Sequence, residues 1–365
     1  MKRYTGIGLM SGTSLDGIDL AYCEFSENEG AWQFELLAAE TIGYDEQWYA
    51  RLRCLDEQDA RAFARTHVYY GHLLGRTLRE FIDRNELKPQ FVASHGQTIF
   101  HQPEKNFTAQ IGDGETIASY LPCPLVANFR NKDVALGGQG APLVPFGERH
   151  LFPKYKLFLN LGGIANLSYS GKAFDVVPCN MALNWLANAL ETPQPFDQDG
   201  AAARSGQMDY ALYDALENLS WYQQTGPKSL GTEWFTAHIL PLISQSESPV
   251  ADRMKTFVLH VVSRITVALR DLQVRSMPLV VTGGGAHNAY LMEELQKSLA
   301  GLGIKIEQLP EAVVDFKEAI IFALLGLQTL LGQPNILASV TGAKLDVCGG
   351  SIHLPPGGWT KTGLI

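Results

Sequence analysis

The stretch TGIGLMSGTSLDGIDLAYCEF, residues 5–25, decides the fold and the first expectation about function. Apolar residues run up to Met10, a small polar loop SGTS follows at 11–14, and apolar and polar residues alternate from Ile18 to Tyr22. Alternation with a period of two is typical of a half-buried β-strand. The stretch therefore predicts a β-hairpin whose tip carries glycines and hydroxyls.

The tip of this hairpin has the groups that a phosphate needs. Its glycines allow close approach of the backbone to a ligand, and its N–H groups with the hydroxyls of Thr13 and Ser14 suit an anionic oxygen. Asp16 and Asp19 suit Mg²⁺, usually through water. We interpret the tip as a nucleotide-phosphate loop. The alternative is an ordinary turn closed by Asp16 and Gly17.

Composition describes a globular chain long enough for two domains. The 365 residues are 46% hydrophobic and 18% charged, and chains of this length usually divide. The net charge of -9 argues against a nucleic-acid partner or an anionic membrane surface. The longest apolar stretch, 319–331, is shorter than the ~20 residues that a membrane helix needs.

The five cysteines are scattered, and none forms a C-x-x-C pair. This usage is typical of a reduced chain without disulfides or structural zinc. The first residues, MKRYTGIGLMSGTS, break into Gly, Ser and Thr before an apolar segment of signal length forms. We therefore expect a cytoplasmic protein.

The pattern of the first hairpin restarts after residue 155, which predicts a duplicated architecture. Strands at 156–161 and 164–169 flank Gly162-Gly163, and a third strand follows at 172–177, as one does at 32–42 after the first hairpin. Helices alternate with the later strands of both halves. We predict an α/β fold of two duplicated domains with a ligand cleft between them.

The expected domains are an N-terminal αβ domain at 1–130 and a second αβ domain at 131–335 with an insertion at about 191–250. A C-terminal tail of about 336–365 is expected to pack back on the first domain, and GGQGAP at 137–142 to link the two. Periodicity predicts helices at 46–85, 115–120, 181–190, 254–272, 288–300 and 315–330, and further strands at 91–94, 98–101, 107–111, 125–127, 278–282 and 304–306.

Two further glycine-rich turns support the nucleotide interpretation. Residues 160–166 form the tip of the second hairpin, and TGGGAHN at 282–288 joins a strand to a helix, whose N-terminus favours an anion. Neither fits the P-loop or the G-x-G-x-x-G pattern. One GGG is more often a tight turn than a binding site, but three such turns in a duplicated frame favour a nucleotide.

Asp175 ends the strand KAFDVV, just before a helix that Asn180 is expected to cap. A carboxylate at that point is suited to take a proton from water or from a sugar hydroxyl during phosphoryl transfer. The alternative is a helix-capping or solvent-facing aspartate. Cys179 has no histidine near it in sequence, so a small helix-start residue is the preferred interpretation.

Other polar residues suit a sugar. The turn HGQT at 95–98 ends a strand with groups that bind hydroxyls, although His95 alone is expected to be structural. Glu318 lies early in an apolar helix, where a carboxylate needs a partner or a ligand; sugar contact and a structural hydrogen bond remain equal alternatives. FDQDG at 196–200 is expected to be a turn.

Eight motifs, in this order, resemble the anhydro-N-acetylmuramic acid kinase family over nearly the whole chain. They are GLMSGTSLDGIDL from Gly8, SHGQTI from Ser94, FR-x-x-D-x-A-x-GGQGAPLVP from Phe129, LN-x-GG-x-x-N from Leu159, FD-x-x-P-x-N from Phe174, FD-x-DG from Phe196, GPKS-x-G from Gly226 and GGGA-x-N from Gly283.

The resemblance implies two duplicated ribonuclease H-like domains of the hexokinase, Hsp70 and actin type, with the active site in the cleft between them. It also implies a reaction: ATP phosphorylates O6 of 1,6-anhydro-N-acetylmuramic acid while water opens the anhydro bridge at C1. Asp175 falls on the catalytic aspartate that deprotonates this water. A bacterial cytoplasm, recycling of cell-wall sugars and a homodimer are further implications.

The expected ligand residues follow from the motifs and the resemblance together. ATP is expected to bind Gly12, Thr13, Ser14, Leu15, Asp16, Gly17, Ile18, Asp19, Gly162, Gly163, Asn166, Gly283, Gly284 and Gly285. The sugar is expected to bind Gln97, Thr98, Arg130, Asn131, Asn180 and Glu318. Asp16 is the expected Mg²⁺ ligand, directly or through water.

The chain departs from the family pattern at a few positions. Val177-Pro178-Cys179-Asn180 stands where G-P-G-N is common, Asn184 where an aspartate is usual, and FRNKD at 129–133 where F-R-R-R-D is usual. Asn cannot offer the bidentate fork of Arg to a lactyl carboxylate. A related anhydrosugar such as levoglucosan is therefore an alternative substrate, and an ATP-hydrolysing regulator of the actin or Hsp70 type an alternative function.

Overall fold

The computed structural model describes residues 2–12, 15, 17–170, 172–223 and 230–359. The chain divides into two compact units, here called unit 1 (Met1–Lys154 with Phe316–Ile365) and unit 2 (Tyr155–Asp315). Each unit is built around one main sheet. In the described part of the chain, no helix combines the length and the apolar character needed to cross a bilayer.

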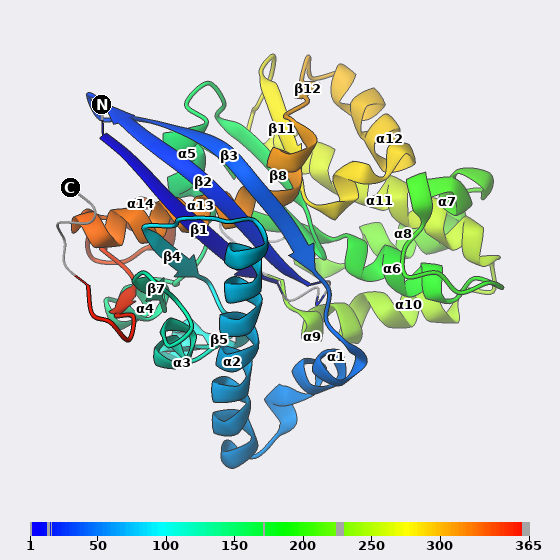
Figure 1. Cartoon of the computed structure of the whole chain (residues 1–365). Helices are drawn as coiled ribbons and strands as arrows, with labels where there is room; N and C mark the ends of the chain where they lie inside the picture. The colour runs from blue at the N-terminus through cyan, green and yellow to red at the C-terminus, as the bar shows by residue number, and fades with distance from the viewer. Residues whose placement is uncertain (1, 13–14, 16, 171, 224–229, 360–365) are drawn as a thin grey trace. The chain divides into compact units, whose positions relative to one another are not determined.

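Unit 1 contains a six-stranded sheet in the order β13-β7-β4-β1-β2-β3 (Figure 1). The predicted hairpin is confirmed: β1 and β2 pair antiparallel up to Ser11 opposite Ile18. Of its tip, Thr13, Ser14 and Asp16 lie outside the described residues. The strands are β1 (Lys2–Ser11), β2 (Ile18–Asn28), β3 (Ala31–Ile42), β4 (Phe91–Ser94), β7 (Leu125–Ala127) and β13 (Ser351–His353).

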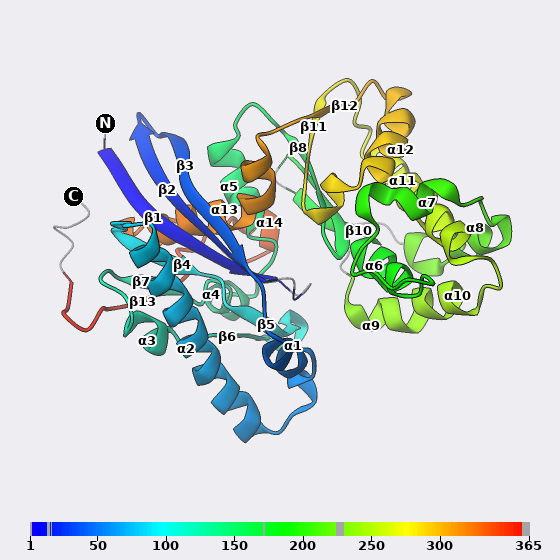
Figure 2. The same ribbon diagram turned by 45° about the vertical axis from the view of Figure 1, so that its right-hand side comes forward.

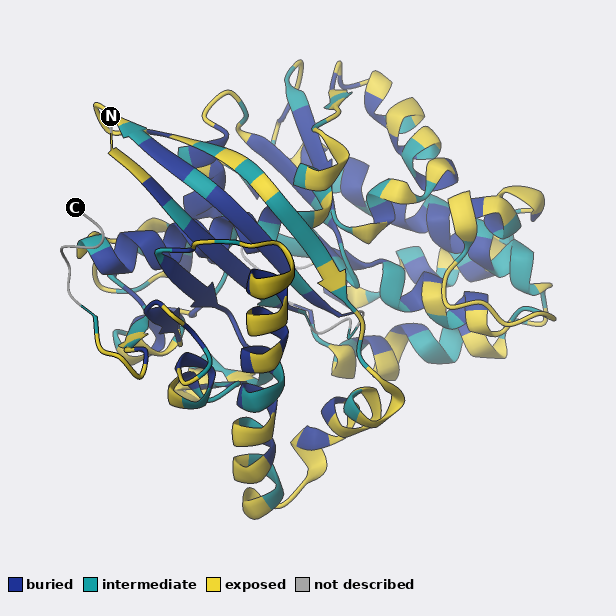
Figure 3. Cartoon of the chain, in the orientation of Figure 1, coloured by how far each residue is buried: buried dark blue, intermediate teal, exposed yellow. Residues whose placement is uncertain are grey.

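Helix α2 (Ala60–Arg84) covers one face of this sheet, and Figure 3 shows its buried side turned toward the strands. Ile7 and Leu9 of β1 share one apolar core with Leu74 and Leu78 of the helix. Residues two apart in a strand lie on the same face, and residues four apart in a helix do too. The alternating apolar residues of β1 and the apolar face of α2 therefore pack together in one core.

Helix α13 (Glu311–Leu331) lies on the opposite face of the sheet (Figures 1 and 2). A Cβ atom added at Gly8 of β1 would lie only 1.8 Å from the backbone oxygen of Ala319. A Cβ at Gly326 would lie 2.5 Å from the side chain of Ala93 in β4. Glycines in the strand and in the helix thus let the backbone of α13 lie directly against the sheet.

The single helix expected at 46–85 is wrong. The structure has α1 (Glu46–Arg53), a 3₁₀ turn η1 (Leu55–Glu57) and then α2. The side chain of Asp59 accepts a hydrogen bond from the backbone N–H of Ala62 at 2.7 Å and begins the second helix. An aspartate at this position is a strong helix-start signal, because it satisfies an N–H group that the helix leaves unpaired.

The remaining elements of unit 1 are short. β5 and β6 form a separate two-stranded hairpin, as predicted, and β13 brings residues 351–353 antiparallel to β7. These elements are β5 (Gln97–Gln102), η2 (Pro103–Lys105), β6 (Phe107–Ile111), α3 (Gly114–Ala118), α4 (Asn131–Ala135), α5 (Val144–Leu151) and α14 (Ala338–Thr341).

Unit 2 contains a five-stranded sheet in the order β10-β9-β8-β11-β12. Three antiparallel strands are followed by two parallel ones, which is also the order and direction of β3-β2-β1-β4-β7 in unit 1. The predicted duplicated α/β architecture is therefore confirmed. The strands are β8 (Leu157–Leu161), β9 (Ile164–Tyr169), β10 (Lys172–Pro178), β11 (Pro278–Thr282) and β12 (Lys305–Glu307).

Helix α11 (Val250–Asp271) organises the helical part of unit 2. It contacts α6, α7, α8, α12 and β10, and its apolar side lies in a single core that also contains β8 and β11. The other elements are α6 (Asn180–Asn188), η3 (Gln198–Gly200), α7 (Ala201–Ser205), α8 (Tyr210–Glu217), η4 (Ser220–Gln223), α9 (Thr232–Trp234), the π-helix η5 (Phe235–Ile239), α10 (Leu240–Gln245), η6 (Gly284–His287) and α12 (Ala289–Ala300).

The units end at other residues than expected, because contacts distant in sequence hold 131–154 and 316–335 in unit 1. Asp133 accepts a hydrogen bond from the Thr341 hydroxyl at 2.8 Å. Glu148 of α5 and Lys317 of α13 form a buried ion pair at 2.9 Å. The segment 137–142, expected to link the domains, lies within unit 1.

Candidate active site

One row of polar side chains crosses the sheet of unit 2. Asn160 of β8 stands beside Thr282 of β11 on one side and Asn166 of β9 on the other, and Asp175 of β10 stands beside Asn166. Direct neighbours on paired strands point to the same face of a sheet. The register therefore aligns a hydroxyl, two amides and one carboxylate, with the carboxylate at the end of the row.

Asp175 is held by the backbone at this position. The N–H of Leu230 donates a hydrogen bond to its Oδ2 at 2.8 Å, and the side chain is half-buried beside a β-bulge that ends at Val177. This backbone donor fixes the orientation of the carboxylate, as a general base requires. Because Asp175 lies within β10 and the N-cap of α6 is Cys179, the helix-capping alternative for Asp175 is wrong.

The glycine-rich turns of unit 2 lie next to this row. Gly283 has a φ of 83°, and a Cβ there would lie 2.5 Å from Oδ1 of Asn160. The carbonyl oxygen of Gly162 accepts a hydrogen bond from the backbone N–H of Asn180 at 3.1 Å. A Cβ at Gly284 would lie 3.6 Å from Nδ2 of Asn180. The two turns and the N-terminus of α6 thus form one corner, where backbone dipoles favour an anion.

Asn180 does not cap α6 as expected. It is the first residue of the helix, whose N-cap Cys179 makes no side-chain hydrogen bond. The amide nitrogen of Asn180 instead donates to the carbonyl of Leu161 at 2.8 Å. The side chain is therefore used to tie the helix start to the β8–β9 turn.

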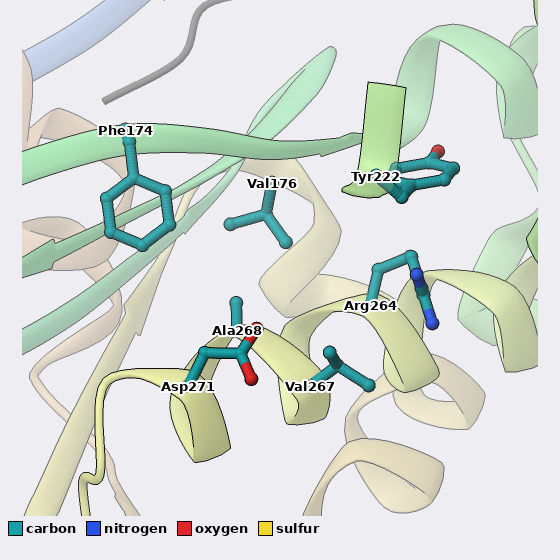
Figure 4. A pocket seen from close by; sticks show the side chains of 7 residues that line it. All are labelled: Phe174, Val176, Tyr222, Arg264, Val267, Ala268 and Asp271. Atoms are coloured by element: carbon teal, nitrogen blue, oxygen red, sulfur yellow. The ribbon is translucent and has the colours of Figure 1, made fainter. Parts of the chain in front are cut away.

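A cavity of about 40 Å³ lies between β10 and α11 (Figure 4). Phe174, Tyr222 and Arg264 are among its lining residues. Because neighbouring residues of a strand point to opposite faces, Phe174 faces away from the side that Asp175 faces. The volume is that of one or two water molecules, so the cavity cannot hold a sugar or a nucleotide.

A hydrogen-bond network in unit 1 connects Ser11, at the end of β1, to the half-buried Arg130. The hydroxyl of Ser11 donates to the carbonyl of Gly96 at 2.9 Å, and Nδ1 of His95 lies 2.8 Å from the same oxygen. Nε2 of His95 lies 3.1 Å from Nε and 2.8 Å from Nη2 of Arg130. Nη1 of Arg130 donates to the carbonyl of Gly140 at 2.6 Å.

Burial lowers the pKa of both His95 and Arg130 in this network. Burial, followed by the neighbouring charge of Arg130, lowers the pKa of His95 to about 3, so the imidazole is neutral. Burial lowers the pKa of Arg130 to about 10, while the carboxylate of Glu318 acts in the opposite direction. Arg130 therefore remains a cation that is poorly solvated and favours an anionic partner.

The other residues expected to bind the sugar are also in unit 1, apart from Asn180. Gln97 is 2% exposed, and its buried Oε1 has no hydrogen-bond partner among the described residues, so it is an acceptor suited to a sugar hydroxyl. The hydroxyl of Thr98 accepts from Gln110 at 3.3 Å. Glu318 is half-buried and Asn131 is exposed at the start of α4.

The loop between β1 and β2, predicted to bind phosphate, is described at Gly12, Leu15 and Gly17. The N–H of Leu15 donates to the carbonyl of Gly12 at 3.2 Å, which closes the loop on itself. Asp19 accepts the hydroxyl of Thr41 at 2.6 Å and is half-buried at the start of β2. The described residues contain no group of three or more His, Cys, Asp or Glu arranged to hold a metal. Mg²⁺ needs only one or two carboxylates when phosphates and waters complete its shell.

A family model, anhydro-N-acetylmuramic acid kinase, matches residues 3–355. The chain belongs to the anhydro-N-acetylmuramic acid kinase family. A kinase uses a nucleotide, so the chain is a nucleotide-using phosphotransferase by family. The curated anhydro-N-acetylmuramic acid kinase of Shewanella baltica OS223 is 34% identical over 96% of this chain and 99% of its own length.

A second curated relative agrees with this result. The anhydro-N-acetylmuramic acid kinase of Aliivibrio fischeri is 34% identical over 94% of this chain and 97% of its own length. Among solved structures, component A of the (R)-2-hydroxyglutaryl-CoA dehydratase of Acidaminococcus fermentans has a TM-score of 0.45 at 13% identity, covering 90% of this chain and 98% of that one.

The departures of this chain from the family pattern lie in different environments. Cys179 is fully buried, and burial raises the pKa of its thiol to about 12, which argues against a nucleophile. Asn184 is exposed on α6. In the FRNKD segment Asn131 is exposed, and Lys132 donates to the carbonyl of Cys348 at 2.5 Å. The arginine that the segment retains is the one within the hydrogen-bond network.

Several residues of the site were missed from the sequence. Thr282 and Asn160 belong to the polar row, and each lies in a predicted motif without being among the residues predicted to bind ATP. Ser11 and Asp133 take part in the unit 1 network. Register and long-range contacts decide these roles, and neither can be obtained by counting residues along one chain.

Proposed function

We propose that this chain transfers the γ-phosphoryl group of ATP to O6 of 1,6-anhydro-N-acetylmuramic acid while water opens the anhydro bridge at C1. The products are N-acetylmuramic acid 6-phosphate and ADP. The observation that supports this best is the carboxylate of Asp175, oriented by the Leu230 N–H at the end of a polar row. Membership of the kinase family supports the choice of substrate.

Asp175 acts as the general base. It takes one proton from the water whose oxygen bonds to C1, and the C1–O6 bond breaks with its electron pair going to O6. O6 then bonds to the γ-phosphorus as the bond to the β–γ bridging oxygen breaks, which releases ADP. The proton on Asp175 returns to solvent. Water, sugar and ATP are thereby fully accounted for in the two products.

Glycine-lined turns hold the nucleotide. We assign phosphate binding to the loop Gly12–Asp19 in unit 1 and to the corner of Gly162, Gly163, Asn166 and Gly283–Gly285 in unit 2. Mg²⁺, when bound, neutralises charge on the phosphates, and Asp16 and Asp19 are the carboxylates assigned to it. Of these residues Thr13, Ser14 and Asp16 lie outside the described ones.

The sugar is assigned to polar groups of both units. Gln97 offers its unsatisfied buried Oε1 to a hydroxyl, and Thr98, Asn131 and Asn180 offer neutral polar groups. Arg130 offers its cation to the lactyl carboxylate, and Glu318 accepts from a hydroxyl. The family assignment also supports a homodimer in a bacterial cytoplasm that recycles cell-wall sugars, and light scattering of the purified chain tests the dimer.

Mass spectrometry of the product made in ¹⁸O-labelled water tests the proposal. We expect one label at C1 together with one added phosphate. The Asp175→Asn variant should lose turnover by about 1,000-fold or more while still binding ATP, because only the base is removed. Asp199→Asn, which changes an exposed carboxylate, is the matched control and should keep full activity.

Two results would contradict the proposal. ADP formation that ignores the anhydrosugar would identify an ATP-hydrolysing regulator instead of a sugar kinase. If levoglucosan, which lacks the lactyl carboxylate, is phosphorylated as fast as 1,6-anhydro-N-acetylmuramic acid, the enzyme does not recognise that carboxylate.

A further inference from the structure

We infer that His95 is a positioning residue, which orients the Arg130 guanidinium toward the substrate and ties it to the nucleotide loop at Ser11. The inference rests on the proposed function. The inference goes beyond the proposed function, because His95 contacts neither the sugar nor ATP in that function and acts through Arg130.

The surroundings of His95 determine its tautomer. Its Nδ1 lies 2.8 Å from the carbonyl oxygen of Gly96, which is an acceptor only, so Nδ1 must carry the hydrogen. In the neutral ring Nε2 is then a lone-pair acceptor. Arg130 carries only donors, and two of its nitrogens lie within 3.1 Å of this Nε2. The histidine side chain is 4% exposed overall, so water does not compete effectively for either nitrogen.

Counting the donors of Arg130 shows what remains for a ligand. A guanidinium has five N–H groups. Nε and one N–H of Nη2 point to Nε2 of His95, and one N–H of Nη1 points to the carbonyl of Gly140. One N–H therefore remains on each terminal nitrogen. Two such donors side by side form the fork that binds a carboxylate in a bidentate manner.

The third contact of Arg130 is also fixed. Asp133 is fully buried, accepts the backbone N–H of Gly140 at 2.7 Å through Oδ2 and accepts the hydroxyl of Thr341 at 2.8 Å through Oδ1. The hydrogen bond from the Gly140 N–H to Asp133 thus fixes the position of Gly140, including its carbonyl. The guanidinium is consequently held on two sides, by an imidazole and by an anchored carbonyl.

The same histidine reaches the nucleotide loop. The carbonyl of Gly96 accepts from Nδ1 of His95 and also from the hydroxyl of Ser11 at 2.9 Å. Ser11 is the last residue of β1 before the loop that is assigned to ATP. A single carbonyl oxygen therefore connects the arginine assigned to the sugar with the residue that begins the phosphate loop.

Two substitutions distinguish the roles of the two ring nitrogens of His95. Glutamine reaches the position of Nε2 and retains an acceptor for Arg130, whereas asparagine retains a donor near Nδ1 and ends short of Arg130. We expect His95→Asn to raise the KM for 1,6-anhydro-N-acetylmuramic acid about tenfold or more. We expect His95→Gln to restore that KM to within about threefold, and the KM for ATP to stay within about twofold in both.

Steady-state kinetics with thermal unfolding of both variants checks this. A sugar KM in His95→Asn equal to that of the unmodified chain would overturn the inference, and so would equal changes in both KM values, which a merely structural role produces. If the unmodified chain does not phosphorylate the sugar, the proposed function fails instead. The ¹⁵N chemical shifts of the His95 ring in the unmodified chain give a test without substitution, because a hydrogen on Nε2 at pH 7 would also overturn the inference.

Discussion

His95 shows at the residue scale how burial turns an ordinary side chain into a fixed acceptor. Sequence alone indicated a structural residue, since one histidine after a strand has many neutral roles. The contact with Arg130 comes from a residue 35 positions away, and no local pattern predicts it. Asp175, by contrast, was predicted to stand at a strand end before a helix, because the transition from alternation to Pro178 is visible in the sequence.

The same residue makes stability depend on pH. The folded-state pKa of His95 is about 3, below its ordinary value of 6.5. Protons therefore bind the unfolded chain first as the pH falls below 6.5, and stability is lost until the pH passes the folded pKa near 3. For this one group we expect a loss of about 2 kcal/mol in the free energy of unfolding between pH 7 and pH 5.

Urea unfolding at pH 7 and pH 5, with His95→Gln as the comparison, measures how much of the loss in the free energy of unfolding comes from His95. Other buried histidines, such as His260, also have lowered pKa values, chiefly through burial, so only the difference between the two chains is assigned to His95. A loss of stability that is the same in both chains would contradict the expectation.

At the scale of elements, the close approach of α13 to β1 depends on the absence of a side chain at Gly8. A Cβ there would lie 1.8 Å from the backbone oxygen of Ala319, and neither backbone can move without disturbing the sheet or the helix. We expect Gly8→Ala to lower the free energy of unfolding by about 3 kcal/mol, at the upper end of the usual cost of overpacking.

Gly43→Ala is the matched control, because a Cβ at Gly43 meets no atom within 4 Å. Its free energy of unfolding should stay within about 0.5 kcal/mol of the original, as for other surface changes. Denaturant titration of both variants gives the comparison. Equal stability of the Gly8→Ala chain and the control would mean that α13 does not lie on the strand as described.

Element boundaries divide into those that the sequence predicts and those that it does not. Strands at 91–94 and 125–127 were predicted with the bounds that the structure has, because short apolar runs between polar residues leave little choice. The helix expected at 46–85 failed because its apolar period continues across the cap at Asp59. A hydrogen bond from one side chain, and not a change of period, separates the two helices.

At the scale of the whole molecule, the duplicated strand order was predicted because both halves open with the same hairpin pattern. The limits of the units were not. Asp133 and Thr341 are 208 positions apart, and the pair of Glu148 with Lys317 likewise closes a long loop of chain. Such contacts decide which unit a segment joins, yet they leave no periodic trace in the sequence.

Nucleotide binding gives a prediction that concerns the entire folded chain. A ligand that binds only the folded state stabilises it by about 2.7 kcal/mol at 100 times its Kd. Gly283 has a positive φ, and a Cβ there would lie 2.5 Å from Oδ1 of Asn160, whereas a Cβ at Gly301, outside the corner assigned to ATP, would meet no atom within 4 Å. Gly283→Ala should therefore distort the corner assigned to ATP, and Gly301→Ala should leave that corner intact.

Thermal unfolding with and without ATP and Mg²⁺ compares the two variants directly. We expect ATP to raise the unfolding midpoint of the Gly301→Ala chain as it does that of the unmodified chain, and to raise that of Gly283→Ala by much less. Subtracting the midpoint without ATP removes the strain that alanine adds at a positive φ. Because this difference reports binding alone, a full ATP effect in Gly283→Ala would show that the nucleotide does not use this turn.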